Sequence, residues 1–82
     1  MALAARINLA EPSGQHSVLA TLTTREREVL SHLVAGRTNA EIARDLFISD
    51  KNVRVHVTNV LRKTGTPNRI EAATLALRLG MS

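Results

Sequence analysis

The stretch AEIARDLFISDKNVRVHVTNVLRK, residues 40–63, decides which fold this sequence predicts. Two segments in it carry apolar residues at helical spacing, and the short connection Phe47-Ile48-Ser49 separates them. The first segment mixes acidic and basic residues, whereas residues 51–63 hold cations and no carboxylate. We therefore expect two helices joined by a tight turn, one of which presents a positively charged face.

Local signals predict where the first two helices begin. Thr23 stands three residues before Glu26, and Thr38 stands three residues before Glu41, so each pair can form a capping box. The first helix is expected at about residues 24–35. The second is only about two turns long and is too short to be stable alone, so it must depend on tertiary packing.

Two further helices show similar signals. Ser49 is the expected N-cap of a third helix at about residues 50–64, and Gly65 can end it in a left-handed conformation. Asn68 and Glu71 are expected to form a third capping box at the start of a fourth helix, which ends before Gly80. Because a single aromatic residue accompanies many Leu, Val and Ala, packed helices are favoured over a sheet. The predicted fold is an all-α four-helix bundle that contains a helix-turn-helix.

Length and composition limit what the protein can be. With 82 residues it forms one domain, and without cysteine it has neither a disulfide nor a thiolate metal site. No apolar run reaches the roughly 20 residues of a membrane span, and the opening MALAARINLA lacks the layout of a signal peptide. We expect a cytoplasmic protein in which residues 1–21 form a flexible tail or linker. A short helix over residues 2–10 is the alternative.

The third helix has two chemically different faces on a wheel of about 3.6 residues per turn. Val53, Val57, Val60 and Leu61 share the face that should pack on the first two helices. The rest of the surface over residues 51–63 carries cations, amides and hydroxyls, with one valine and no carboxylate. Such a surface suits phosphate, because each neutralised phosphate releases condensed counterions. Its residues are Lys51, Asn52, Arg54, Val55, Thr58, Asn59, Arg62 and Lys63.

The tight connection between the second and third helices permits a specific mode of docking on double-stranded DNA. The second helix can lie across the backbone while the N-terminal half of the third enters the major groove. Arg54, Val55 and Thr58 are then expected to reach base edges, since arginine pairs with guanine and valine can meet a thymine methyl. Thr38 and Asn39 would offer donors to a phosphate. The full predicted DNA-binding set is Thr38, Asn39, Lys51, Asn52, Arg54, Val55, Thr58, Asn59, Arg62 and Lys63.

The segment LTTREREVLSHLVAGRTNAEIARDLFISDKNVRVHVTNVLRKTGTPNRIEAA, which begins at Leu22, resembles the DNA-binding domain of LuxR/FixJ-type transcription regulators, also called the GerE-type helix-turn-helix. The resemblance covers about residues 22–80, so residues 22–82 are expected to form this domain. The order and spacing of its marks make it specific. They are Leu22-Thr23, Arg25-Glu26-x-Glu28-Val29-Leu30, Gly36, Asn39, Glu41-Ile42-Ala43, Ile48-Ser49, Lys51, Val53, His56-Val57, Asn68-Arg69 and Glu71-Ala72.

The resemblance implies a wingless four-helix domain whose third helix reads the major groove to regulate transcription. It also implies dimerisation through the fourth helix on an inverted repeat, RNA polymerase as a partner, and a place behind a sensor, such as the phosphoacceptor of a response regulator. Three residues depart from the family pattern: Asn52 replaces a threonine, Thr64 an apolar residue and Thr66 an aliphatic one. The last two reduce the apolar burial expected between the third and fourth helices.

The fourth helix is apolar over more than half of its circumference. One face, with Ala72, Ala76 and Leu79, suits the domain core. A helix that packs once should show one apolar stripe, so a second apolar face indicates a second contact. We expect a homodimer through this second face; a broader contact within the same domain is the alternative. The predicted dimerisation residues are Ile70, Ala73, Thr74 and Leu77.

Other classes of function find less support in the sequence. His16, His32 and His56 lack the spacing of a metal site, and no catalytic motif occurs. We therefore expect no enzyme activity and no metal, cofactor or small-molecule ligand. A helix-turn-helix that binds only protein would lose the basic face, which this chain retains, and RNA binding lacks an aromatic stacking platform. Double-stranded DNA is the expected partner.

Overall fold

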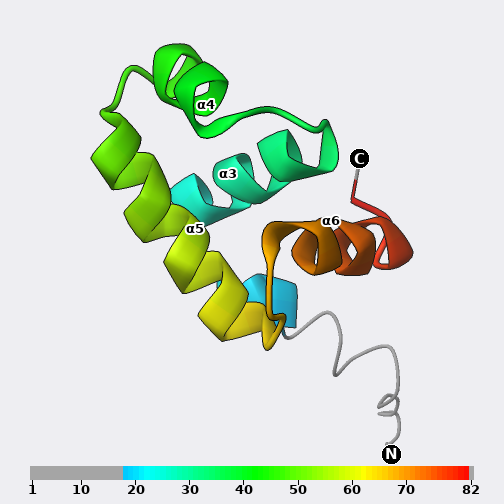
Figure 1. The fold of residues 1–82 in the computed structure, drawn as a ribbon. Coiled ribbons are helices and arrows are strands. Elements are labelled where there is room, and N and C mark those ends of the chain that lie inside the picture. Colours follow the sequence, from blue (N-terminus) through cyan, green and yellow to red (C-terminus); the bar gives the residue numbers. More distant parts are fainter. Residues whose placement is uncertain (1–17, 82) are drawn as a thin grey trace, which may run out of the picture.

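The computed structural model describes residues 18–81. Short connections join its helices, and no strand occurs among the described residues. The prediction of an all-α fold is confirmed. None of the helices in this part of the chain is long and apolar enough to cross a membrane. The helices are α3 (Thr24–Val34), α4 (Asn39–Leu46), α5 (Asp50–Thr64) and α6 (Arg69–Arg78) (Figure 1).

Two of the three predicted capping boxes are confirmed, whereas at the start of α6 only the Glu71 N–H donates to Asn68 Oδ1, at 2.9 Å, and the return bond from Glu71 does not form. At the start of α3, the Glu26 N–H donates to Thr23 Oγ1 at 3.1 Å, and the Thr23 N–H donates to Glu26 Oε1 at 2.9 Å. Thr38 and Glu41 form the same pair of bonds at 3.1 and 2.9 Å at the start of α4. A cap of this kind contributes about 1 kcal/mol, because it satisfies backbone N–H groups that have no partner within the helix.

The turn between α4 and α5 depends on one left-handed residue. Phe47 has φ 58° and ψ 45°, and its N–H donates to the Ala43 carbonyl. The Ile48 N–H donates to the same carbonyl at 3.0 Å. Ser49 Oγ then accepts from the Asn52 N–H at 3.1 Å and begins α5. The chain thus leaves one helix and enters the next within three residues, as predicted.

The hydrophobic core lies where α3 meets α5 and α6, and α4 packs against α5 (Figure 1). Val53 and Val60 of α5 are fully buried, while Val57 and Leu61 pack against the core from its edge. The predicted inward face of α5 is therefore confirmed. The buried apolar residues are Leu22, Val29, Leu30, Leu33, Ile42, Ala43, Val53, Val60, Ala72 and Ala76.

The connection between α5 and α6 contains the two threonines that replace apolar residues of the family pattern. Thr64 Oγ1 donates to the Val60 carbonyl at 2.7 Å and lies 2.8 Å from Thr66 Oγ1. Gly65 between them ends α5 with φ 68°. The two hydroxyls therefore have hydrogen-bond partners at this corner, which the predicted loss of apolar contact did not include.

Residues before α3 take part in the fold at least from Val18. Residues 18–20 are helical, and Leu19 packs against the core. The described fold therefore includes residues 18–21, which were assigned to the tail in the prediction. The predicted tail otherwise falls on residues 1–17, which lie outside the described residues, as does the alternative helix over residues 2–10.

Candidate nucleic-acid interface

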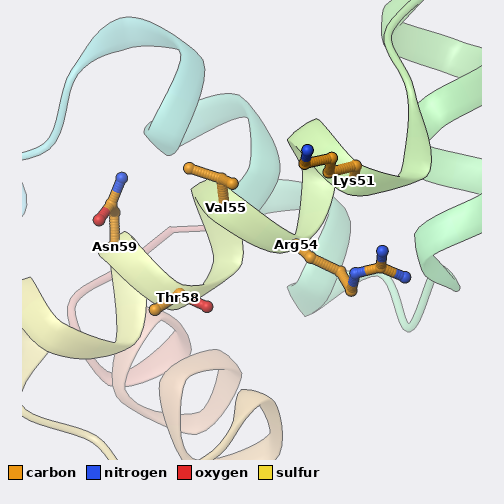
Figure 2. A pocket seen from close by; sticks show the side chains of 5 residues that line it. All are labelled: Lys51, Arg54, Val55, Thr58 and Asn59. Carbon is orange, nitrogen blue, oxygen red and sulfur yellow. The ribbon is translucent and has the colours of Figure 1, made fainter.

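Five side chains of α5 line an open depression of about 510 Å³ on the outer face of the helix. Figure 2 shows them in two rows: Lys51, Val55 and Asn59 project on one side, and Arg54 and Thr58 on the other. Members of a row are four residues apart, so helical geometry aligns them. The structure thus brings together five of the predicted DNA-binding residues.

Val55 differs in its surroundings from the other valines of α5. Its side chain is 50% exposed, whereas Val53 and Val60 are fully buried on the opposite side. The buried valines hold the helix against the core, which fixes the direction of the outer rows. An exposed aliphatic group among cations supplies apolar contact next to hydrogen-bond donors, the combination that base edges in a major groove require.

A second open groove, of about 360 Å³, adjoins the first. Arg54 and Thr58 line both, so the two depressions form one continuous surface along α5. Asn39, from the start of α4, and Arg69, from the start of α6, line the second groove. No carboxylate lines either groove within residues 18–81. We call this joint surface the basic groove.

Arg37, which precedes α4, forms ion pairs with the two acidic residues of that helix. Arg37 lies 2.6 Å from Asp45 Oδ2 through Nη2 and 3.5 Å from Glu41 Oε1 through Nε. The backbone hydrogen bond from Thr38 lowers the pKa of Glu41, and the nearby charge of Arg37 acts in the same direction. These pairs partly neutralise the carboxylates of α4, which reduces their repulsion of an approaching polyanion.

Asp50, the first residue of α5, is a carboxylate that lines neither depression. An acidic residue in the first turn stabilises a helix through its macrodipole, which accounts for this residue at that place. Asn52 is exposed in the same turn and lines neither depression. Further along α5, Arg62 Nη2 donates to Asn59 Oδ1 at 2.9 Å, so two predicted DNA-binding residues are joined on the surface.

Lys63 makes hydrogen bonds within the fold that its sequence position does not predict. Its Nζ donates to Glu26 Oε1 at 2.8 Å and to the Thr21 carbonyl at 3.3 Å. The Glu26 side chain is 5% exposed and that of Lys63 is 25% exposed. The hydrogen bond from Lys63 lowers the pKa of Glu26. Two of the three N–H donors of Lys63 therefore serve the fold.

The predicted dimerisation face of α6 is exposed except at one residue. Ile70 is 71% exposed and Leu77 is 56% exposed. Thr74 is also exposed, and its hydroxyl donates to the Ile70 carbonyl at 3.0 Å. Ala73 is half-buried and packs against the domain core. The apolar surface available on α6 thus consists mainly of Ile70 and Leu77, one on each side of Thr74 along the helix.

The family described as "Bacterial regulatory proteins, luxR family" matches residues 20–76, more than half of this chain. The chain belongs to the luxR family. The spore germination protein GerE of Bacillus subtilis (strain 168) is 49% identical over 59 residues, which cover 72% of this chain and 80% of that protein. The transcriptional regulatory protein LiaR of the same organism is 45% identical over 58 residues, 71% of this chain and 28% of LiaR.

A solved structure of the transcription factor GerE has the same fold, with a TM-score of 0.66 and 42% sequence identity. The match covers 73% of this chain and 90% of that chain. The predicted family is therefore confirmed. The chain carries the DNA-binding helix-turn-helix of luxR-family transcription regulators, with α4 and α5 as its two helices. The expectation that the protein is not an enzyme is confirmed too, because its relatives are transcription regulators.

Sequence reasoning missed one polar residue of this luxR-family surface. Arg69 was assigned no role beyond its place in the family pattern, yet its Nη2 donates to Asn39 Oδ1 across the basic groove. The two residues are 30 positions apart, so no local spacing rule connects them. The sequence does contain one signal for this contact. The macrodipole disfavours a cation at the start of a helix, so a specific partner for Arg69 could be expected.

Proposed function

We propose that this luxR-family domain binds double-stranded DNA sequence-specifically and thereby regulates transcription, with α5 in the major groove. The observation that carries the proposal is the outer face of α5 between Lys51 and Asn59. It combines two cations, two polar side chains and an exposed valine in two aligned rows, and no carboxylate lies among them (Figure 2). We further propose the cytoplasm as the location of the protein and RNA polymerase as a second partner.

Base edges are read from the two rows of α5. Arg54 can donate two hydrogen bonds to guanine O6 and N7, and Val55 can contact a thymine methyl. Thr58 adds a hydroxyl that can donate or accept. Lys51 lies nearest to the start of the helix, where the N-terminal half of a recognition helix is deepest in the groove.

Contacts to the sugar-phosphate backbone flank this central set. Thr38 and Asn39 lie at the N-terminus of α4, where backbone N–H groups favour an anion. Asn52, Asn59 and Arg62 can contact backbone along α5. Such contacts set the register of the helix on the duplex and carry no direct sequence information. Lys63 also belongs to the proposed set of DNA contacts. Two of its N–H donors bond within the protein, and the remaining one can contact the DNA backbone.

The proposed DNA complex is a dimer on an inverted repeat. The exposed apolar residues Ile70 and Leu77 support contact between two copies of α6, with Thr74 between them and Ala73 at the edge. One helix of ten residues buries less than the roughly 1,200 Å² of a specific stable interface, so DNA should strengthen the dimer. Two copies related by a two-fold axis would place their α5 helices on two half-sites.

Selection of bound duplex from a random pool tests the proposed function directly. The 82-residue chain is used at a stated salt concentration, because phosphate contacts make affinity strongly salt-dependent. We expect enrichment of one motif with two inverted halves. A single enriched half-site would refute the dimer and retain sequence-specific binding. A pool that remains random, together with unchanged α5 amide shifts on titration of duplex at low salt, would refute the proposal.

A further inference from the structure

One hydrogen bond links the first residue of α6 to the first residue of α4. Arg69 Nη2 donates to Asn39 Oδ1, and both side chains are partly buried. The bond spans the basic groove, which both residues line together with Arg54 and Thr58. It therefore connects the helix proposed for dimerisation with the helix-turn-helix.

The chemistry of the two groups determines how the Asn39 amide is turned. A guanidinium has only donors, and a side-chain amide has one oxygen acceptor and one NH2 group with two donors. Arg69 can therefore bond only to the oxygen of Asn39. Among residues 18–81, the structure records no acceptor for Asn39 Nδ2. Both donors of the amide remain available for a ligand.

The position of this NH2 group indicates what kind of acceptor it meets. Asn39 lines a groove that has no carboxylate among its described residues and that continues through Arg54 and Thr58 into the proposed base-reading face. An anionic oxygen accepts from amide donors and is attracted by the guanidinium groups nearby. If α5 lies in the major groove, as proposed above, the anionic oxygens next to it are those of DNA phosphates.

We propose that Arg69 is a positioning residue that fixes the Asn39 amide with its NH2 group toward a DNA phosphate. Arg69 acts through Asn39 and makes no DNA contact of its own. The inference rests on the proposed function and adds to it a role for a residue of α6. Without Arg69, the amide can turn either end toward the phosphate, and its oxygen end repels the anion.

A double-mutant cycle measured on the selected duplex tests the proposal. Asn39→Ala should weaken binding by roughly ten- to a hundredfold, as expected for loss of a hydrogen bond to a charged group. Arg69→Met, which removes the donors and keeps an unbranched side chain, should weaken it roughly threefold in the native background. In the Asn39→Ala background, Arg69→Met should have no further effect, because the group it orients is gone.

The salt dependence separates positioning from direct contact. A positioning residue leaves the slope of log affinity against log salt unchanged, whereas loss of one phosphate contact reduces it by about 0.9. Equal losses from Arg69→Met in both backgrounds, with that smaller slope, would show that Arg69 itself binds phosphate and would overturn the proposal. Native affinity in Asn39→Ala would overturn it as well.

Two further variants control for charge and for folding. Arg78→Met removes a cation from the exposed C-terminal end of α6 and should leave binding nearly unchanged. Asn39→Asp keeps an acceptor for Arg69 but removes both donors, so it should retain the thermal midpoint and bind more weakly than Asn39→Ala. Binding by Asn39→Asp at the native level would contradict the inference. Failure of the native protein to bind any duplex would instead refute the proposed function, and the inference with it.

Discussion

Lys63 near the end of α5 donates a 2.8 Å hydrogen bond to Glu26 in the first turn of α3, joining residues 37 apart. Glu26 also accepts from the Thr23 N–H at 2.9 Å, so one carboxylate closes a helix cap and holds a second helix. Lys63 reaches the Thr21 carbonyl as well, at 3.3 Å. Helix α5 is thus tied to the segment that leads into the domain.

Removal of Lys63 should destabilise the fold. Lys63→Met keeps the aliphatic stem but leaves the nearly buried Glu26 carboxylate without its cation, which should lower the free energy of unfolding by about 1–3 kcal/mol. Urea denaturation followed by circular dichroism measures the change. Arg62→Met, on the exposed side of the same turn, is the matched control and should change it by less than about 0.5 kcal/mol. Equal stability of the two variants would argue against a structural role for the ion pair.

The ion pair also predicts how stability depends on pH. The hydrogen bond from Lys63 lowers the pKa of Glu26 in the folded protein below its ordinary value of 4.5. Between the two values the unfolded state binds more protons, so the stabilisation is complete above pH 4.5 and is lost as pH falls through the folded pKa. Chemical denaturation at pH 7 and at pH 3 measures how much the free energy of unfolding falls with pH. This fall should be smaller for Glu26→Gln than for the native protein. Identical losses would contradict this assignment.

Arg54 should contribute both affinity and base preference. Arg54→Ala is expected to weaken binding to the selected site by about 1–3 kcal/mol if the guanidinium makes two bonds to guanine, with a broader preference at that base pair. Arg44→Ala removes the same charge from the exposed surface of α4, outside both depressions, and should have little effect on base preference. Uniform weakening of Arg54→Ala on all sequences would mean that Arg54 contacts phosphate alone.

The exposed apolar face of α6 predicts self-association. Leu77→Glu places a charge on a side chain that is 56% exposed, so it should leave the thermal midpoint intact and shift sedimentation toward monomer. Ala40→Glu adds the same charge at an exposed site on α4 and is the control. A native dimer that persists in Leu77→Glu would rule out this interface.

Phe47 offers a test of backbone strain in the turn. It is a non-glycine residue with φ 58°, and its side chain is 94% exposed, so no buried contact offsets the left-handed conformation. Phe47→Gly should raise the free energy of unfolding by up to about 1 kcal/mol, whereas Phe47→Ala, which retains Cβ, should not. A gain in Phe47→Ala equal to that in Phe47→Gly would mean that the exposed ring, and not the backbone, is the cause.

Helix boundaries and the inward face of α5 follow from the sequence, because the contacts that determine them are local. The Thr23–Glu26 and Thr38–Glu41 caps join residues three apart, and the spacing of Val53 and Val60 is set by the helical repeat. The two outer rows of α5 obey the same repeat. Five of the predicted DNA-binding residues therefore lie together as the helical wheel indicated.

Only the tertiary structure decided what Lys63, Asn39 and Ala73 contact. Lys63 and Asn39 find their partners 37 and 30 residues away, and Ala73 packs against a core assembled from several helices. A wheel tells which side of a helix is outward, but it does not locate the neighbouring helix ends. A long cation or amide can reach such an end only after packing has brought the two elements together, and this is why these assignments required the fold.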